Sequence, residues 1–224
     1  MDDTQRLTAR LGGRFLIGGG VVLALVTWGE RFVGPLVIPG QEVVLDPVPA
    51  RVLHLVSYPA ILFLVLGAAA LGMVLRGYGR AAVLAAAGVG LGFALGALPH
   101  TVLDWAAIPA VFDRLPEAEA RELVMSFYGF DGLVGPVAMV GMLGLVLGTL
   151  TLGILGLRRD ALPRGLAWAS VALLPASFAL EALNSAFPDA PIPHSPVLFD
   201  LLVVAYGWQL LQQSRVVKRV PTTV

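Results

Sequence analysis

Residues 133–157 read LVGPVAMVGMLGLVLGTLTLGILGL, a run of 25 residues without a charged side chain. A helix needs about 20 predominantly apolar residues to cross the hydrocarbon core of a bilayer, which is roughly 30 Å thick. Continuous apolar sequence favours a helix over a membrane β-barrel, in whose strands apolar and polar residues alternate. The stretch therefore predicts a transmembrane helix.

Five further windows have the same apolar character, at residues 15–28, 52–75, 81–98, 162–183 and 196–211. Hydrophobic residues make up 57% of the 224-residue chain and charged residues only 13%. A soluble domain carries about 25% charged residues, so this chain has too few to cover a water-facing surface. We therefore predict an all-α, polytopic transmembrane bundle of six spans, with residues 1–224 forming a single transmembrane domain.

The same composition excludes several classes of protein. The 15 Lys and Arg residues are balanced by 15 Asp and Glu residues, which leaves no basic excess to hold a nucleic acid. The absence of cysteine excludes disulfides, thiolate metal sites and a cysteine nucleophile. The sequence also lacks the phosphate-binding GxxxxGK[ST] loop, the HExxH zinc helix and the GxSxG nucleophile elbow.

The basic residues are distributed unequally between the two sides of the predicted bundle. One side carries Arg6, Arg10, Arg14, Arg76, Arg80, Arg158, Arg159, Arg164, Arg215, Lys218 and Arg219, and the other carries Arg31, Arg51, Arg114 and Arg121. Cytoplasmic loops carry the excess of Lys and Arg, so both chain ends are expected in the cytoplasm. This orientation requires an even number of spans, and we expect a multi-pass protein of a bacterial inner membrane.

Glycines recur at helical spacing inside two of the spans. Gly88, Gly92 and Gly96 are four residues apart in one span, and so are Gly144 and Gly148 in another. Small residues on one helix face allow close backbone approach, which drives helix association in lipid. The pattern predicts packing between helices of the same chain. The alternative is a homo- or hetero-oligomer through these glycine-rich faces.

Residues 99–131 form the longest predicted outer loop and are expected to form a helical cap on the outer face. Its first part, Thr101 to Leu115, spaces apolar residues at helical intervals, which predicts an interfacial helix. Pro116 then precedes a second helical piece from Glu117 to Tyr128, with proline at a position that helix starts favour.

Four polar residues suggest a ligand-binding cluster at the outer ends of the spans. His100 and Asp104 are four residues apart and share a helix face. Glu181 and Asp200 lie within apolar runs, where an ionisable side chain is costly, so both are expected to face the bundle interior and to mark a functional position. Asn184 follows Glu181 by three residues and shares its helix face. We expect a membrane binding or accessory protein whose outer-leaflet cavity takes a lipid or a small apolar ligand, with membrane lipids as partners.

The histidines support an alternative. His54, His100 and His194 are all expected at the outer side, and three histidines with one open position form a common catalytic zinc centre. A zinc-bound water would attack an ester or amide, with Glu181 or Asp104 as the general base. Haem held by His54 and His100 is a further alternative. A small-solute transporter is a third possibility, although the chain shows no internal repeat of the transporter kind.

The last third of the chain resembles uncharacterised six-helix bacterial membrane proteins of the high-GC type. The resemblance rests on LRRDALPRG at residues 157–165 and VVAYGWQLL at residues 203–211, the latter followed by a basic tail. It implies a six-helix membrane bundle and brings no activity or site residue with it.

Overall fold

The computed structural model describes residues 2–33, 48–97, 111, 114–128, 132, 134–187, 190 and 192–215. Within these ranges it describes the backbone alone at residues 30–33, 48–51, 53–54, 97, 117, 121, 124–125 and 127–128. The described chain is all-α, as the sequence predicts. Its helices are α1 (Asp3–Val33), α2 (Val48–Leu75), α3 (Arg80–Leu91), α6 (Glu117–Tyr128), α7 (Val134–Arg159), α8 (Arg164–Ala186) and α9 (Pro196–Arg215).

Two short elements extend these helices. The 3₁₀ turn η1 (Arg76–Tyr78) joins α2 to α3, and the π-helical segment η2 (Gly92–Ala97) continues α3. Among the described residues, 4 helices are long and apolar enough to cross a membrane, namely α1, α2, α7 and α8. The helix formed by α3 and η2 is apolar but shorter. These lengths and compositions support a membrane protein.

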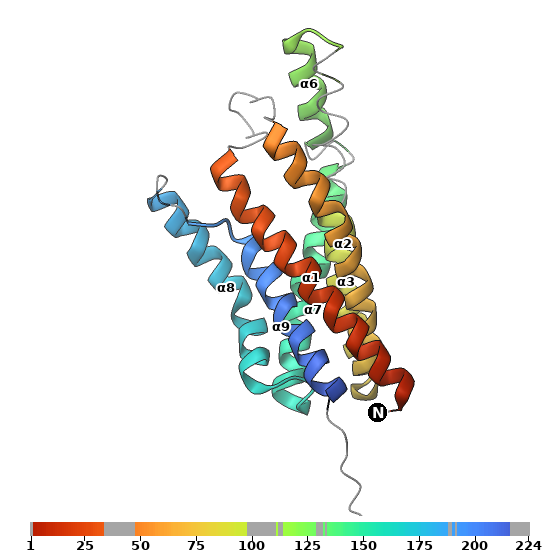
Figure 1. Ribbon diagram of the computed structural model, residues 1–224. Helices are drawn as coiled ribbons and strands as arrows, with labels where there is room; N and C mark the ends of the chain where they lie inside the picture. The colour runs from red at the N-terminus through yellow and green to blue at the C-terminus, as the bar shows by residue number, and fades with distance from the viewer. Residues whose placement is uncertain are drawn as a thin grey trace, which may run out of the picture.

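The long helices form a closed ring of neighbours (Figure 1). Helix α1 lies between α2 and α9, α3 packs against α2 and α7, and α8 packs against α7 and more lightly against α9. The core between them includes Leu16 of α1, Leu71 of α2 and Tyr206 of α9, each less than 2% exposed. Helix α1 begins and α9 ends at the same end of the bundle.

Helix α1 begins 12 residues before the predicted span, at Asp3 instead of Phe15. Two hydrogen bonds at its start explain the difference. The Asp2 Oδ1 atom accepts the Gln5 amide at 2.7 Å, and the Asp2 amide donates to Gln5 Oε1 at 3.4 Å. This reciprocal pair is a capping box, which satisfies amides at a helix start. The prediction followed apolar residues alone and so missed a start made by polar side chains.

The predicted glycine faces of two helices meet within the chain. A Cβ atom at Gly88 of α3 would lie 2.8 Å from the Gly144 carbonyl oxygen of α7, and one at Gly148 would lie 2.5 Å from the Ala85 carbonyl oxygen. Only glycine allows the backbones to approach this closely. The expected packing within one chain is therefore confirmed at this contact. Association with another chain stays a prediction.

Glycines also place α1 between its two neighbours. A Cβ atom at Gly13 would lie 2.7 Å from the Gly207 carbonyl oxygen of α9, and one at Gly19 would lie 2.6 Å from the Ala60 carbonyl oxygen of α2. One glycine face of α1 is thus turned toward α9 and another toward α2. These contacts fix the height of α1 in the bundle.

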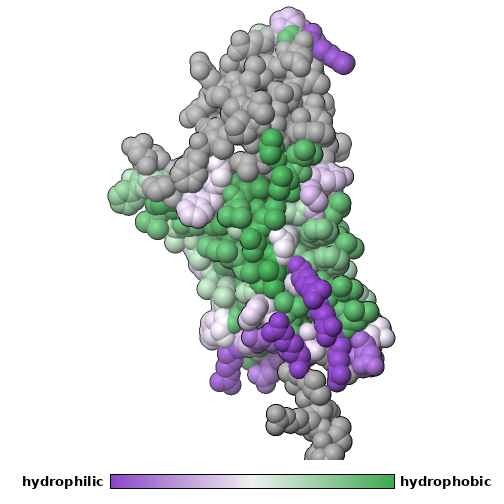
Figure 2. Space-filling view, in the orientation of Figure 1, coloured by the Kyte–Doolittle hydropathy of each residue, from purple (hydrophilic) through white to green (hydrophobic). Residues whose placement is uncertain are grey.

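The surface divides into an apolar band and a hydrophilic end (Figure 2). Large apolar side chains are widely exposed, among them Leu84 at 71% and Phe178 at 70%. Exposure on this scale is unusual for a water-facing surface and is typical of contact with lipid. The end of the bundle where the chain begins carries Arg6, Arg10, Arg14, Arg76, Arg80, Arg158, Arg159, Arg164 and Arg215.

Helix α6 stands at the opposite end of the bundle. Its bounds, Glu117–Tyr128, are those that the sequence predicts. Pro116 lies just before the first helical residue, because its carbonyl oxygen accepts the Ala120 amide at 2.9 Å. The predicted interfacial helix at 101–115 lies outside the described residues except for Val111, Arg114 and Leu115.

Candidate functional site

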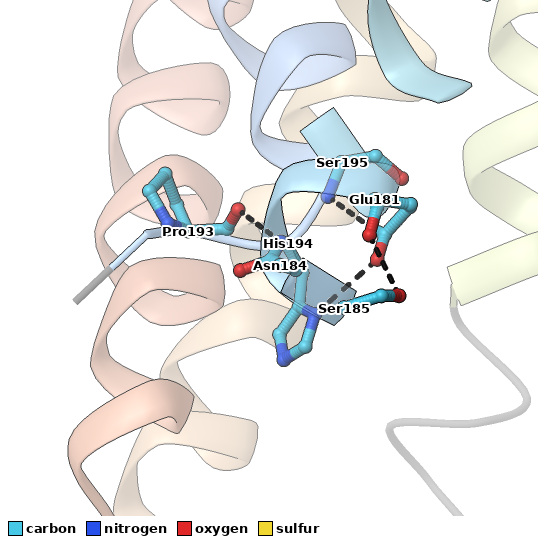
Figure 3. A network of polar contacts seen from close by, with 6 residues as sticks. All are labelled: Glu181, Asn184, Ser185, Pro193, His194 and Ser195. Carbon is cyan, nitrogen blue, oxygen red and sulfur yellow. Dashed lines mark hydrogen bonds and ion pairs between the residues drawn. The ribbon is translucent and has the colours of Figure 1, made fainter. Parts of the chain in front are cut away.

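The side chain of Glu181 connects the C-terminal end of α8 to the start of α9 (Figure 3). Its Oε1 atom accepts the backbone N–H of Ser195 at 2.7 Å. Ser195 immediately precedes α9, whose first residue, Pro196, has no N–H to satisfy. A carboxylate at a helix start also interacts favourably with the helix dipole. Glu181 therefore contributes to the start of α9.

His194 and Asn184 contribute to the same connection between α8 and α9. We call this connection the joint; it consists of Glu181, Asn184, Pro193, His194 and Ser195. The His194 Nδ1 atom lies 3.9 Å from Glu181 Oε2, which makes an ion pair whenever the imidazole is protonated. The Asn184 side-chain amide donates to the Pro193 carbonyl oxygen at 3.0 Å. Glu181 and Asn184 thus both hold the segment that leads into α9, as expected for two residues on one face of α8.

One acceptor in the joint is unused. Asn184 is 8% exposed, and its Oδ1 atom is buried with no hydrogen-bond partner among the described residues. A buried polar atom in this state is costly, because burial removes the hydrogen bonds that water would provide. Asn184 was not among the predicted site residues, although its spacing of three residues places it on the same helix face as Glu181.

Asp200 is buried at a different contact, between α9 and α1. It is 4% exposed, and its Oδ2 atom accepts the hydroxyl of Thr27 at 3.2 Å. Asp200 therefore faces the bundle interior, as expected for a carboxylate in an apolar run, whereas the side chain of Glu181 is half-exposed. A hydrogen-bonded carboxylate at this position holds α9 against α1, and Thr27 went unnoticed in the sequence because a threonine in an apolar span is unremarkable.

The predicted metal ligands are only partly within the described residues. His100 and Asp104 lie outside them, and so does the side chain of His54, although its backbone belongs to α2. In the part of the chain that the structure describes, no group of three His, Asp or Glu side chains is placed to hold a metal ion. Convergence of His54, His100 and His194 on zinc, or of His54 and His100 on haem, stays a prediction.

A small pocket lies lower in the bundle, between α7, α8 and α9. Its volume is about 90 Å³, and its walls are mainly apolar. It is lined by Val146, Thr149, Leu150, Ser170, Val171, Leu173, Leu174, Pro175 and Phe199. Ser170 and Pro175 precede Glu181 on α8 by 11 and 6 residues, which places the pocket roughly 9–16 Å below the joint at 1.5 Å per residue.

The polar groups at the pocket are hydrogen-bonded in a defined direction. The Ser170 hydroxyl donates to the Leu166 carbonyl oxygen at 2.8 Å, and its oxygen lies 2.7 Å from the Tyr206 hydroxyl. Because the serine hydroxyl has only one hydrogen, Tyr206 is the donor between the two. The Thr149 hydroxyl likewise donates to the Leu145 carbonyl oxygen, at 2.8 Å. Both hydroxyls are therefore committed to the protein.

Pro175 removes one backbone hydrogen bond of α8 beside the pocket. Proline has no N–H, so the Val171 carbonyl loses the helical hydrogen bond that residue 175 would otherwise donate. Val171 and Pro175 both line the pocket. The arrangement offers an apolar ligand a small recess beside the position where the helical hydrogen bonding of α8 is interrupted.

No local sequence pattern marks these residues as the lining of a pocket. Pro175 interrupts α8 and is readable in the sequence, but the residues of α7 and α9 that form the pocket beside it are distant along the chain.

No family model matches the chain, and no match is found among curated proteins or solved structures.

Proposed function

We propose that this chain is a multi-pass membrane protein that binds a lipid chain or another small apolar ligand, and acts as a binding or accessory protein. The observation that carries the proposal is the apolar pocket between α7, α8 and α9. Ligand sites are typically concave and mainly apolar, with a few polar groups that orient the ligand.

The size and position of the pocket favour the end of an acyl chain. An apolar cavity of about 150 Å³ is large enough for benzene. At about 90 Å³ this pocket suits a shorter, narrower group. Leu174 on the pocket wall is 41% exposed. Only 22% of the apolar stretch of α8 is buried inside the protein. The pocket therefore opens toward the surface that lipid tails would cover, and a chain enters without crossing the core.

The sequence predicted that His100, Asp104, Glu181 and Asp200 form the polar contacts of the ligand. In this proposal only some of them keep that role. Glu181 and Asp200 are already engaged in holding α9. The Asn184 Oδ1 atom, which has no hydrogen-bond partner among the described residues, is a more suitable contact for a polar group of the ligand at this end. His100 and Asp104 keep their proposed role there.

For the membrane arrangement, we infer six spans, with α3–η2 and α9 added to the four longer apolar helices. Arg80–Leu91 and Gly92–Ala97 comprise 12 and 6 residues and extend about 27 Å. Helix α9 has 20 residues, about 30 Å. Both lengths suit a bilayer. The arginine-rich end then faces the cytoplasm of a bacterial inner membrane, with the start of α1 and the end of α9 on that side.

The proposal is tested by filling the pocket. The full chain is purified in mild detergent, and native mass spectrometry measures binding of dioleoylphosphatidylethanolamine, a lipid without net charge. Val171→Phe places a ring in the pocket and should abolish a saturable binding step. The matched control is Val140→Phe, also on the long helices but at a side chain that is 59% exposed.

Two results would contradict the proposal. One is non-saturable lipid uptake by the unmodified chain. The other is equal uptake by the Val171→Phe and Val140→Phe chains when both have the same thermal unfolding temperature as the unmodified protein. Loss restricted to Val171→Phe supports it.

A further inference from the structure

A stripe of arginines on α1 rises from the basic end of the bundle into its apolar part. Arg6, Arg10 and Arg14 are four residues apart, so they follow one side of the helix. Arg10 and Arg14 are exposed. In Figure 2 hydrophilic residues extend upward from the basic end along the course of α1.

The glycine contacts show how far into the bundle this stripe reaches. Gly13 lies against Gly207 and Leu211 of α9. These residues precede Arg215, at the end of α9, by 8 and 4 positions, or roughly 12 and 6 Å. Arg14 therefore lies well above the level of Arg215. The contact of Gly12 with Ala70, on the other side of α1, gives the same result relative to Arg76.

Arg10 and Arg14, the two arginines of the stripe nearest the apolar part of the bundle, have no partner in the described part of the protein. Arg6 approaches Asp3 at 3.9 Å, but no ion pair or hydrogen bond joins Arg10 or Arg14 to a described side chain. A guanidinium group at this depth requires an anion or water, because charged groups are costly in an apolar environment. No described residue therefore neutralises these two charges, and they are available to an anionic group.

The surface above the stripe suits an acyl chain. At Gly18, one turn above Arg14, an added Cβ would meet no atom within 4 Å. Val21 and Leu25 follow, with exposed fractions of 43% and 61%. A bare backbone followed by exposed apolar side chains gives a lipid tail a continuous track along α1.

We propose that α1 binds an anionic phospholipid, with the phosphate at Arg10 and Arg14 and one acyl chain along Gly18, Val21 and Leu25. Helical side chains point toward the helix N-terminus, so both arginines extend from α1 toward the headgroup level. The guanidinium fork matches phosphate oxygens. This site is separate from the pocket between α7, α8 and α9. The pocket is proposed to take an apolar chain, whereas this site recognises the negative charge of the headgroup.

The test compares two lipids that differ only in headgroup. Native mass spectrometry of the detergent-purified full chain measures binding of dioleoylphosphatidylglycerol and dioleoylphosphatidylcholine. A basic residue near the surface contributes about fivefold to anionic-lipid affinity, so R10Q/R14Q should lose about 25-fold in phosphatidylglycerol affinity. R158Q/R164Q removes the same charge from exposed positions on α7 and α8 and should lose much less.

The conservative variant R10K/R14K should keep most of the preference for phosphatidylglycerol, which separates lost charge from misfolding. Equal losses in R10Q/R14Q and R158Q/R164Q would overturn the site, since they would show attraction to the basic end as a whole. Equal binding of the two lipids by the unmodified chain would also overturn it. So would displacement of the phospholipid by inorganic phosphate, because the acyl chain would then contribute nothing.

Discussion

At the scale of single residues, Glu181 shows how a costly ionisable group in a span is accommodated. Its carboxylate accepts the Ser195 amide, which has no place in the hydrogen-bond ladder of α9. The neighbouring Asn184 holds Pro193. Both side chains therefore satisfy backbone groups at a tight connection, and the partially exposed carboxylate lies near the end of α8, where the insertion cost is lower.

Glu181→Ala should destabilise the protein by about 1 kcal/mol, because the Ser195 amide loses a charged acceptor at a helix start. Glu181→Gln keeps an acceptor oxygen at the same place and should cost less. Thermal unfolding in detergent measures both changes. Glu122→Gln, at an exposed position on α6, is the control and should leave the unfolding temperature unchanged. An unchanged Glu181→Ala protein would contradict this role.

Part of the candidate site was predictable from the sequence, residue by residue. The sequence placed Glu181 and Asn184 on one face and directed Asp200 inward, since these statements follow from helical spacing and from the cost of charge in lipid. The sequence did not predict the hydrogen bonds that Thr27 makes with Asp200 and Tyr206 makes with Ser170. Their roles arise because α1 and α8 approach α9, and no local pattern encodes those approaches.

At the scale of helices, small residues decide which faces meet. The face of Gly88, Gly92 and Gly96 was readable as a repeat of four, and it does contact α7. The glycine pairs at Gly12–Gly13 and Gly19–Gly20 repeat after seven residues and serve two neighbours at once. Adjacent residues on a helix point about 100° apart, so paired glycines fit a helix that lies between two others.

Gly148→Ala should destabilise the contact between α3 and α7. The added methyl would lie 2.5 Å from the Ala85 carbonyl oxygen and 2.9 Å from the Val89 nitrogen, and backbone atoms cannot move aside cheaply. Overpacking of this kind costs about 1–3 kcal/mol. Gly18→Ala is the matched control, because its methyl meets nothing within 4 Å. Equal unfolding temperatures for the two variants would refute the close approach.

At the scale of the whole molecule, the bundle has two unlike ends. The connections from α2 to α3 and from α7 to α8 are short, and lie at the arginine-rich end with the start of α1. Arg159 links two of these connections, because its Nη1 atom donates to the Tyr78 carbonyl oxygen at 3.1 Å. Helix α6 stands at the other end. The proposed orientation follows from this asymmetry.

Because the chain has no cysteine, single cysteines report its orientation without a background signal. Ser126→Cys on α6 should react with a membrane-impermeant maleimide in intact bacterial cells. Gly77→Cys, in the open turn between α2 and α3, should react only after lysis. Labelling of both sites in intact cells would contradict the proposed topology, and the reverse pattern would invert it.

By itself the sequence determined the all-α class, the apolar helices and their approximate bounds, and helix α6. These properties depend on composition and on periodicity within one segment, which are local. The start of α1 was also encoded locally, by Asp2 and Gln5, but in polar residues outside the apolar pattern. Only the tertiary structure decided that α1 lies between α2 and α9, that Asp200 meets Thr27, and that Pro175 borders a pocket. Each of these depends on which helices become neighbours. In lipid, that choice depends on the fit between whole helix surfaces, which local sequence patterns do not record.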